Sequence, residues 1–206
     1  SSVKRIESYS FKDCSSLTKI SIPSSVKSIG EHSFENCISL KEIIIFSYLT
    51  KIEKSTFQGC VSLTKLSIPF SVIEIDSYSF CGCLSLVEMQ IPSSVELIRS
   101  YAFKDCTKLI EVTIDLYETD VQDNAFENCV SIENLNLQTE SPMSEINSIE
   151  LISKIKTINI PKTVTSIESY AFNNFKSITH ITIPSTIKKI GSFVFHNCSS
   201  LHSIDI

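Results

Sequence analysis

Residues 17–30, Leu-Thr-Lys-Ile-Ser-Ile-Pro-Ser-Ser-Val-Lys-Ser-Ile-Gly, hold the pattern that decides the fold. Ile20 and Ile22 alternate with polar residues, which is the period-two pattern of a half-buried strand. Pro23 has no backbone N–H and therefore ends that strand. Val26 and the residues after it form a second short extended segment. The stretch thus predicts two short strands separated by a tight turn.

The pattern returns every 23 residues without an insertion or deletion. The most regular position of the repeat is a phenylalanine, and in one coil Ile149 takes its place. The phenylalanines of this column are Phe11, Phe34, Phe57, Phe80, Phe103, Phe126, Phe172 and Phe195. One coil cannot bury its apolar edge alone, whereas stacked coils share a continuous core. We therefore expect nine coils whose strands pair in parallel about 4.8 Å apart.

This unit resembles the BspA-like class of leucine-rich repeats, whose pattern is LxxIxIPxSVxxIGxxAFxxC. Residues 22–30 and 91–95 match it almost letter for letter, and the resemblance covers the whole chain. It implies one β-rich solenoid over residues 1–206, with right-handed coils and a parallel sheet on the concave face. Short strands and helical turns are then expected on the other side. Because neither end has a polar capping repeat, we expect a segment of a longer array.

Composition and motifs argue against several functions. The net charge is −5 with no basic run, which disfavours nucleic-acid binding. No apolar stretch is long enough to cross a membrane. The sequence has no phosphate-binding loop, dinucleotide fingerprint or zinc-protease motif, and its four histidines fall in four different columns. We therefore expect no enzymatic activity, no cofactor and no metal site.

Seven of the eight cysteines stand three residues after the phenylalanine column. Stacked neighbours about 4.8 Å apart are too distant for a disulfide, which needs Cβ atoms about 3.8 Å apart. Ile152 and Phe175 fill the same column, so these cysteines are predicted to act as small buried hydrophobes. Disulfides or a metal site are the alternative. Cys81 lies in a polar column and is expected to be the accessible thiol, either inert or used in an intermolecular disulfide.

One coil, at about residues 138–160, departs from the pattern. Ser141 and Pro142 are typical of a helix start. Apolar residues then recur at helical spacing at Met143, Ile146, Ile149 and Ile152. We predict a helical turn or two there. The coil is either a decayed repeat or a docking or hinge site.

Two groups of side chains are candidates for binding a protein partner. A polar row faces outward on the concave strands, where it serves either recognition or solubility and register. This row contains Lys19, Glu42, Lys65, Glu88, Glu111, Asn134, Thr157 and His180. A rim of apolar residues stands where other coils have proline or serine, and it either binds or packs against the adjacent coil. The rim contains Phe46, Tyr48, Phe70, Leu116 and Tyr117.

The leading hypothesis is a non-catalytic protein-binding module of an adhesin-like protein, using the concave face and the rim. The resemblance implies a cell-surface or extracellular location, but it does not identify the ligand, since ligand contacts lie in the variable columns. The alternative is an intracellular scaffold or assembly component in the cytoplasm. Eight cysteines without evident bridges fit a reducing compartment.

Overall fold

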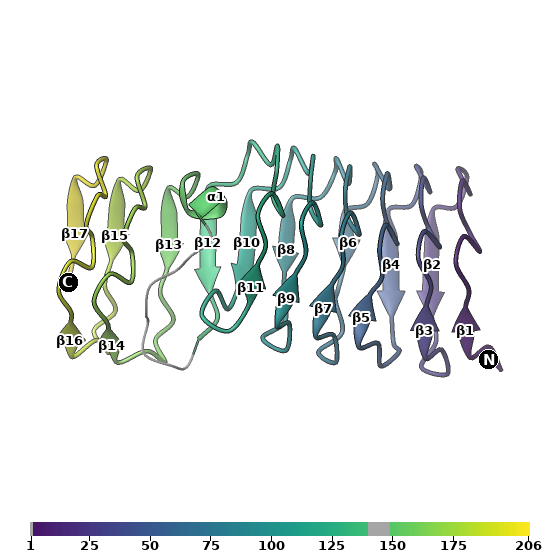
Figure 1. The fold of residues 1–206 in the computed structure, drawn as a ribbon, viewed down its shortest axis with the longest axis horizontal. Helices are drawn as coiled ribbons and strands as arrows, with labels where there is room; N and C mark the ends of the chain where they lie inside the picture. The colour runs from purple at the N-terminus through teal and green to yellow at the C-terminus, as the bar shows by residue number, and fades with distance from the viewer. Residues whose placement is uncertain (1, 140–148) are drawn as a thin grey trace.

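Most coils add one strand to each of two parallel ladders in the computed structural model, which describes residues 2–139 and 149–206 (Figure 1). The strands of the first ladder, here called the long-strand face, are β2 (Lys19–Ile22), β4 (Glu42–Ile45), β6 (Lys65–Leu66), β8 (Glu88–Gln90), β10 (Glu111–Ile114), β12 (Asn134–Leu137), β13 (Thr157–Asn159), β15 (His180–Thr182) and β17 (Ser203–Asp205). Those of the second, here called the short-strand face, are β1 (Arg5–Ile6), β3 (Ser28–Ile29), β5 (Lys51–Ile52), β7 (Glu74–Ile75), β9 (Leu97–Ile98), β11 (Asp120–Val121), β14 (Ser166–Ile167) and β16 (Lys189–Ile190).

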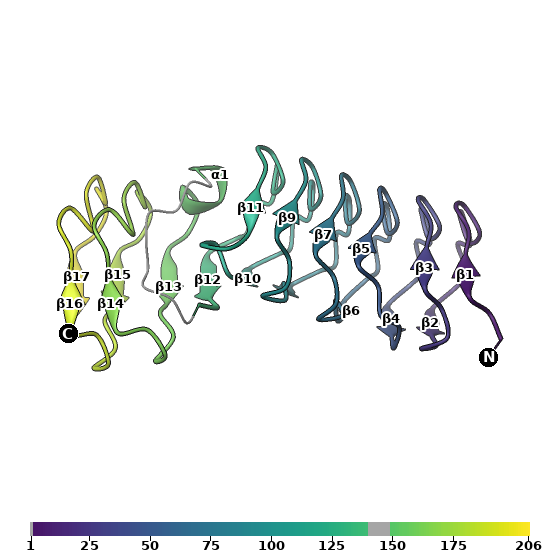
Figure 2. The ribbon, with the colours of Figure 1, turned by 60° about the horizontal axis from the view of Figure 1, so that its bottom comes forward.

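The parallel solenoid predicted from the repeat is confirmed, with about eight complete turns in place of the nine coils counted from the sequence. The long-strand face is the one that the resemblance implies to be concave. Figure 2 shows the two ladders as separate rows along the same axis, and Figure 1 places the chain ends at opposite ends of it. Paired strands stand in register at a spacing of 23 residues, as for Lys19, Glu42 and Lys65. Columns of the sequence therefore become rows on the surface.

The phenylalanine column forms a stacked row in the interior. Phe80 is fully buried, and its ring centroid lies 5.4 Å from that of Phe57 and 5.1 Å from that of Phe103. Such offset stacks add to the free energy gained by burying the rings. The row continues without interruption from Phe11 to Phe126, which confirms that the repeat stacks coil on coil.

The cysteine column lies beside the phenylalanines, and all eight cysteines of the chain are free thiols. The prediction that the column belongs to the core is confirmed, but these thiols also act as donors. Six of them donate from Sγ to the carbonyl of the phenylalanine in the preceding coil, at 3.0–3.4 Å. Where Ile152 replaces cysteine, the Nζ of Lys154 donates to the carbonyl of Phe126 instead, at 3.1 Å.

Cys81 is partly exposed, and so are Cys14 and Cys198. The expectation that Cys81 would be the single accessible thiol is therefore wrong. Cys14 and Cys198 belong to the first and last coils described, where fewer neighbours cover them. Burial raises the pKa of Cys81, which leaves less thiolate at neutral pH.

The departing coil contains one short helix, α1 (Ile149–Ile152). This turn agrees with the end of the predicted helical stretch, while Met143 and Ile146 lie outside the described residues. The long-strand ladder crosses this coil unbroken, because β12 pairs directly with β13.

Hydrogen-bonded pairing is interrupted at different coils on the two faces. The long-strand face divides into β2-β4-β6, β8-β10-β12-β13 and β15-β17. The short-strand face divides into β1-β3, β5-β7-β9-β11 and β14-β16. The break between β6 and β8 therefore lies beside the continuous ladder β7-β9. Staggered breaks keep the coils stacked while one face is locally open.

Candidate functional site

The predicted polar row lies on the long-strand face, but the break between β6 and β8 divides it. On one side, the Nζ of Lys19 lies 2.7 Å from a carboxylate oxygen of Glu42, and Lys65 is the next residue in register. The hydrogen bond from Lys19 lowers the pKa of Glu42 below its ordinary value. This part of the row alternates in charge, from Lys19 to Glu42 to Lys65.

On the other side of the break, β8, β10, β12 and β13 align Glu88, Glu111, Asn134 and Thr157. Glu111 accepts a hydrogen bond of 2.7 Å from the side chain of Asn136. Within the described part of the chain, Glu88 has no ion pair or side-chain hydrogen bond. An exposed carboxylate beside a second carboxylate favours a cationic group on a partner.

His180 lies apart from the rest of the row, on β15. Its Nδ1 is 2.8 Å from the hydroxyl of Ser203, and its Nε2 is 3.5 Å from a carboxylate oxygen of Asp205. These neighbours come from the next strand, β17. His180 thus belongs to a small polar cluster at one end of the face.

Some side chains of the rim are exposed, and others are packed against the core. Phe46, Tyr48 and Phe70 are 62%, 76% and 83% exposed. Leu116 is buried, and Tyr117 is partly buried against the core. Burial raises the pKa of Tyr117, and its hydroxyl has no hydrogen-bond partner among the described atoms. The packing interpretation therefore fits Leu116 and Tyr117, whereas the other three side chains remain available to a partner.

A cavity of about 410 Å³ opens on the long-strand face where β6 and β8 are not paired. Its lining includes Lys65, Leu66, Ile68, Phe70, Glu88 and Gln90. It brings together Lys65 and Glu88 from the row and Phe70 from the rim. The repeat did not predict this cavity, because equal coil lengths contain no signal for one unpaired strand edge.

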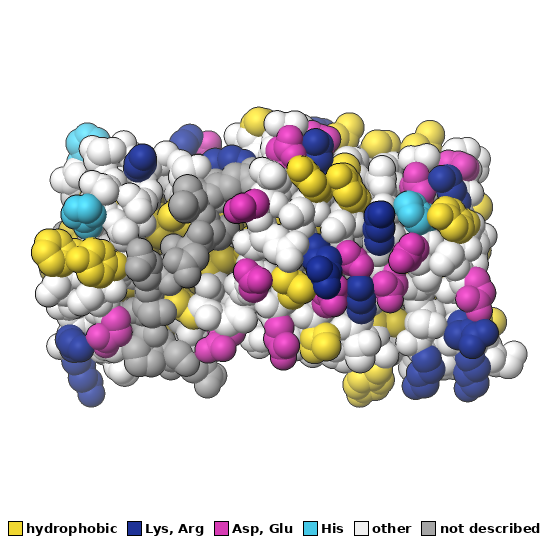
Figure 3. All heavy atoms as spheres, in the orientation of Figure 1, with side chains coloured by type: hydrophobic (Ala, Val, Ile, Leu, Met, Phe, Trp, Pro, Cys, Tyr) yellow, Lys and Arg dark blue, Asp and Glu magenta, His cyan; other side chains and the backbone are white. Residues whose placement is uncertain are grey.

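A second aromatic column, not among the predicted site residues, lies two residues before the core phenylalanines. Tyr78 and Tyr101 stack with ring centroids 5.1 Å apart, and Tyr170 and Phe193 stack at 5.3 Å. All four have positive φ, which is uncommon for bulky residues. The signal was present as the recurring Tyr-x-Phe spacing. Figure 3 shows hydrophobic side chains in small groups among charged and other polar groups on one face of the molecule.

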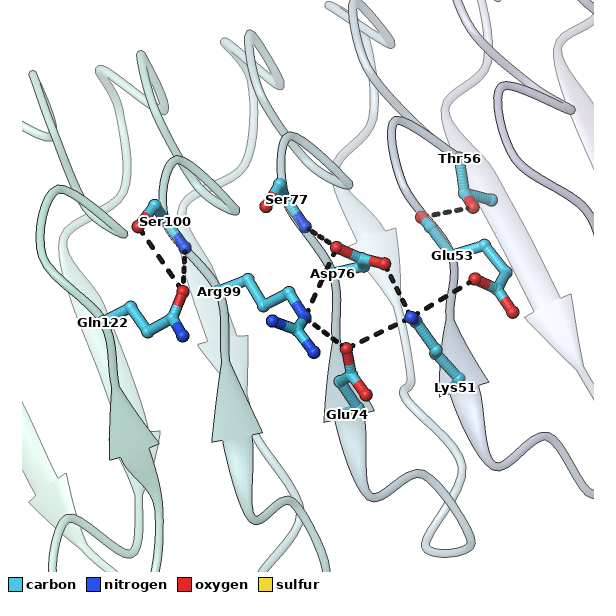
Figure 4. A network of polar contacts seen from close by, with 9 residues as sticks. All are labelled: Lys51, Glu53, Thr56, Glu74, Asp76, Ser77, Arg99, Ser100 and Gln122. Carbon is cyan, nitrogen blue, oxygen red and sulfur yellow. Dashed lines mark hydrogen bonds and ion pairs between the residues drawn. The ribbon is translucent and has the colours of Figure 1, made fainter.

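The short-strand face holds a network of charges across β5, β7 and β9 (Figure 4). The Nζ of Lys51 lies 3.5 Å from Glu53, 3.1 Å from Glu74 and 2.6 Å from Asp76. Arg99 pairs with Glu74 and lies 3.6 Å from Asp76. Every charged group of the network has a partner of opposite charge, with three carboxylates sharing two cations, so the network joins neighbouring coils.

Burial alone would raise the pKa values of Glu74 and Asp76. Hydrogen bonds outweigh it: Glu74 accepts from Arg99 and Lys51, and Asp76 accepts from Lys51 and the amide of Ser77. The pKa values of both carboxyl groups are therefore lower than usual. The same pairing raises the pKa of Lys51, although burial opposes it.

Stacked 23-residue coils with two parallel ladders and one phenylalanine row define a leucine-rich-repeat solenoid. The chain belongs to the BspA type leucine rich repeat family, whose model matches residues 4–133 and 119–206 in six copies. Members are typically interaction or surface repeat modules, commonly surface-associated, and the fold is typically non-catalytic.

Several solved structures are similar to this chain. A leucine-rich repeat protein of T. pallidum is 20% identical, with a TM-score of 0.47, over 97% of this chain and 72% of that one. One from Bacteroides ovatus is 19% identical, with a TM-score of 0.39, over 98% and 82%. A leucine rich cell surface protein of Faecalibacterium prausnitzii is 21% identical, with a TM-score of 0.35, over 98% and 83%. Comparison with curated proteins finds no match.

Residues 2–139 and 149–206 contain no helix of the length and apolarity that a membrane span needs. In the same ranges, histidine, cysteine, aspartate and glutamate side chains form no cluster of three that would hold a metal ion. The candidate site consists of exposed side chains and one cavity on the long-strand face.

Proposed function

We propose that this chain is a protein-binding module whose partner docks on the long-strand face. The observation that carries the proposal is the exposure of Phe46, Tyr48 and Phe70, the last of which also lines the cavity. Large aromatic side chains bury much apolar area when a partner covers them, and they are frequent at the energetic centre of interfaces. Three of them within two adjacent coils provide such a centre.

The polar row supports the proposal by supplying two charged residues to the cavity that Phe70 lines. Lys65 lies on one side of the cavity and Glu88 on the other, and both are exposed. Opposite charges at separate positions orient a partner and raise its rate of association. The expected partner is therefore a protein with apolar and charged groups on one surface.

The proposed setting is an adhesin-like protein at the cell surface, in keeping with the common location of the family. A specific observation favours a second candidate, an intracellular scaffold. All eight cysteines are free, which suits a reducing compartment. The two settings differ in the partner, which is a surface or matrix protein in one and a cytosolic protein in the other.

The test compares two triple variants that remove exposed apolar side chains. The first is Phe46→Ser, Tyr48→Ser and Phe70→Ser. The matched control removes Ile38, Leu84 and Val130, which are also exposed but share one column after the cysteine turn. Proteins captured from surface and cytosolic fractions are identified by mass spectrometry, and the affinity of each variant for the purified partner is then measured.

The rim variant is expected to lose at least about tenfold in affinity, which corresponds to about 1.4 kcal/mol. The control variant should bind as the wild type does. Both should keep the wild-type melting temperature, because the deleted side chains are exposed. Equal binding by the two variants, or unfolding of the rim variant alone, contradicts the proposal.

A further inference from the structure

The long-strand sheet is open between the third and fourth of its strands. Among the described strands, β6 pairs only with β4, and β8 pairs only with β10. The facing edges of these strands, residues 64–68 and 87–90, are called the seam below. An unpaired strand edge presents backbone N–H and C=O groups that bind another extended chain.

The neighbouring coils show which hydrogen bonds a closed junction makes. The amides of Ile110 and Glu111 donate to the carbonyl of Val87 at 2.8 and 3.3 Å. The amide of Ile91 donates to the carbonyl of Thr113 at 2.9 Å. These three bonds join the coil of β8 to that of β10.

The corresponding bonds are missing at the seam. They would join the amides of Val87 and Glu88 to the carbonyl of Thr64, and the amide of Ile68 to the carbonyl of Gln90. None of the three is formed among the residues that the structure describes. Donors and acceptors of two parallel strands therefore face each other without pairing.

The coils stay together at this position through other contacts. On the short-strand face, β7 and β9 form parallel backbone pairs, with Glu74 opposite Leu97 and Ile75 opposite Ile98. Inside, the stacked phenylalanine row passes the seam without a break. The opening is thus a local feature of one face and leaves the solenoid continuous.

The seam coincides with the cavity of about 410 Å³, a volume in the range of ligand sites. Phe70 and Leu66 supply apolar surface in its lining, and Gln90 supplies a polar side chain. Lys65 and Glu88 stand on opposite edges, and no ion pair joins them in the described structure. The lining therefore suits a segment with both apolar and charged side chains.

We infer that the seam binds an extended peptide segment of a partner protein, whose backbone pairs with the open strand edges. An apolar side chain of the segment lies against Phe70, an acidic one lies near Lys65, and a basic one lies near Glu88. This inference rests on the proposed function, since both use the long-strand face, and it names the class of partner.

Hydrogen exchange of the native protein tests the seam itself. The amides of Val87, Glu88 and Ile68 are expected to exchange at least about tenfold faster than their counterparts in the closed junction, which are Ile110, Glu111 and Ile91. Equal protection of both sets would overturn the inference. Protection that grows with protein concentration would also overturn it, because the occupant would then be a second copy of the chain.

The probe for the ligand is a synthetic octapeptide of alternating threonine and valine with one glutamate and one lysine. At millimolar concentration it should slow exchange of the seam amides and leave the closed junction unchanged. Its matched control is N-methylated at alternate residues, which removes backbone donors and keeps every side chain. The proposal is wrong if the first peptide does not slow exchange of the seam amides, or if both peptides slow it equally.

Charge reversal provides a second readout. Lys65→Glu should weaken peptide binding several-fold, and a peptide whose glutamate is replaced by lysine should restore it. Lys27→Glu, an exposed reversal away from the seam, should have no effect. If the rim variant loses its protein partner while the peptide leaves seam amides unprotected, the proposed function stands and only the seam inference fails.

Discussion

Six of the seven cysteines in the column fill space in the core and donate a hydrogen bond from the thiol. Cys106 is fully buried, and its Sγ lies 3.2 Å from the carbonyl oxygen of Phe80. Cys60 belongs to the same column, and burial together with the neighbouring Cys37 raises its pKa to about 12. This thiol therefore carries the proton that it donates at neutral pH. Cysteine therefore supplies both packing and a hydrogen-bond donor in this column, whereas Ile152 and Phe175 supply packing alone.

Cys106→Ala should lower the free energy of unfolding by about 1 kcal/mol, because it leaves a small cavity and removes the thiol donor. Cys81→Ala is the control, since this thiol is partly exposed and lies outside the column. Its effect should stay within about 0.5 kcal/mol. Urea unfolding followed by circular dichroism measures both, and equal losses would contradict a special role for the column.

At the scale of the strand, the short-strand ladder is joined by charged side chains as well as by its backbone. Lys51 on β5 reaches Glu74 on β7 and the following Asp76, and Arg99 approaches them from the coil of β9. These side chains are only partly exposed, so water screens them less than the exposed pair of Lys156 and Glu133.

Lys51→Ala should lower the free energy of unfolding at pH 7 by roughly 1–2 kcal/mol, because Glu74 and Asp76 lose a shared partner. The pKa values of both carboxyl groups are lowered in the folded state. Their contribution is therefore complete above the unfolded values of about 4 and is lost as the pH falls through the folded values.

The measurement is urea unfolding of the wild type and of Lys51→Ala at pH 7, 5 and 3. The difference between them should be largest at pH 7 and should shrink at pH 3. Lys156→Ala removes the exposed pair with Glu133 and should change stability by no more than about 0.5 kcal/mol. A Lys51→Ala penalty that does not change with pH would contradict the assigned role of the network.

At the scale of the whole molecule, stability is close to a sum of coils and of the contacts between neighbours. The phenylalanine row shows this plainly, since Phe80 touches one ring on each side. At one end of the row, Phe11 stacks on Phe34 and is only partly buried. The same residue type therefore contributes differently according to its coil.

Phe80→Ala should destabilise the protein by about 3–5 kcal/mol, because it removes a buried ring from two stacks. Phe11→Ala should cost less, since that ring is partly exposed and its stack with Phe34 is the only one found in the described residues. Denaturant unfolding read by circular dichroism compares the two. A cost for Phe11→Ala equal to that for Phe80→Ala would contradict the dependence on position.

The solenoid, its register and its core could be predicted because they follow from constant spacing. A column such as Lys19 and Glu42 becomes a row as soon as the coils stack. The seam could not be predicted, since the spacing is the same at open and closed junctions. The burial of Tyr117 likewise depends on the space between two coils, which its column does not reveal.

The stacked pair Tyr78 and Tyr101 lies outside the core and could be foreseen only as a recurrence in the sequence. Its left-handed backbone depends on how the turn closes, not on the apolar pattern. Whether the polar row and the rim bind a partner is a property of the partner as much as of this chain, so the spacing of the repeat does not determine it.

The constant 23-residue spacing has an evolutionary consequence. Deleting or duplicating one whole unit leaves every other coil facing the kind of neighbour that it faced before, so recombination within the gene shortens or lengthens the molecule while preserving its cross-section. Point changes in the outward columns then alter recognition without disturbing the interior. The number of coils and the binding specificity of the surface can thus change independently during evolution.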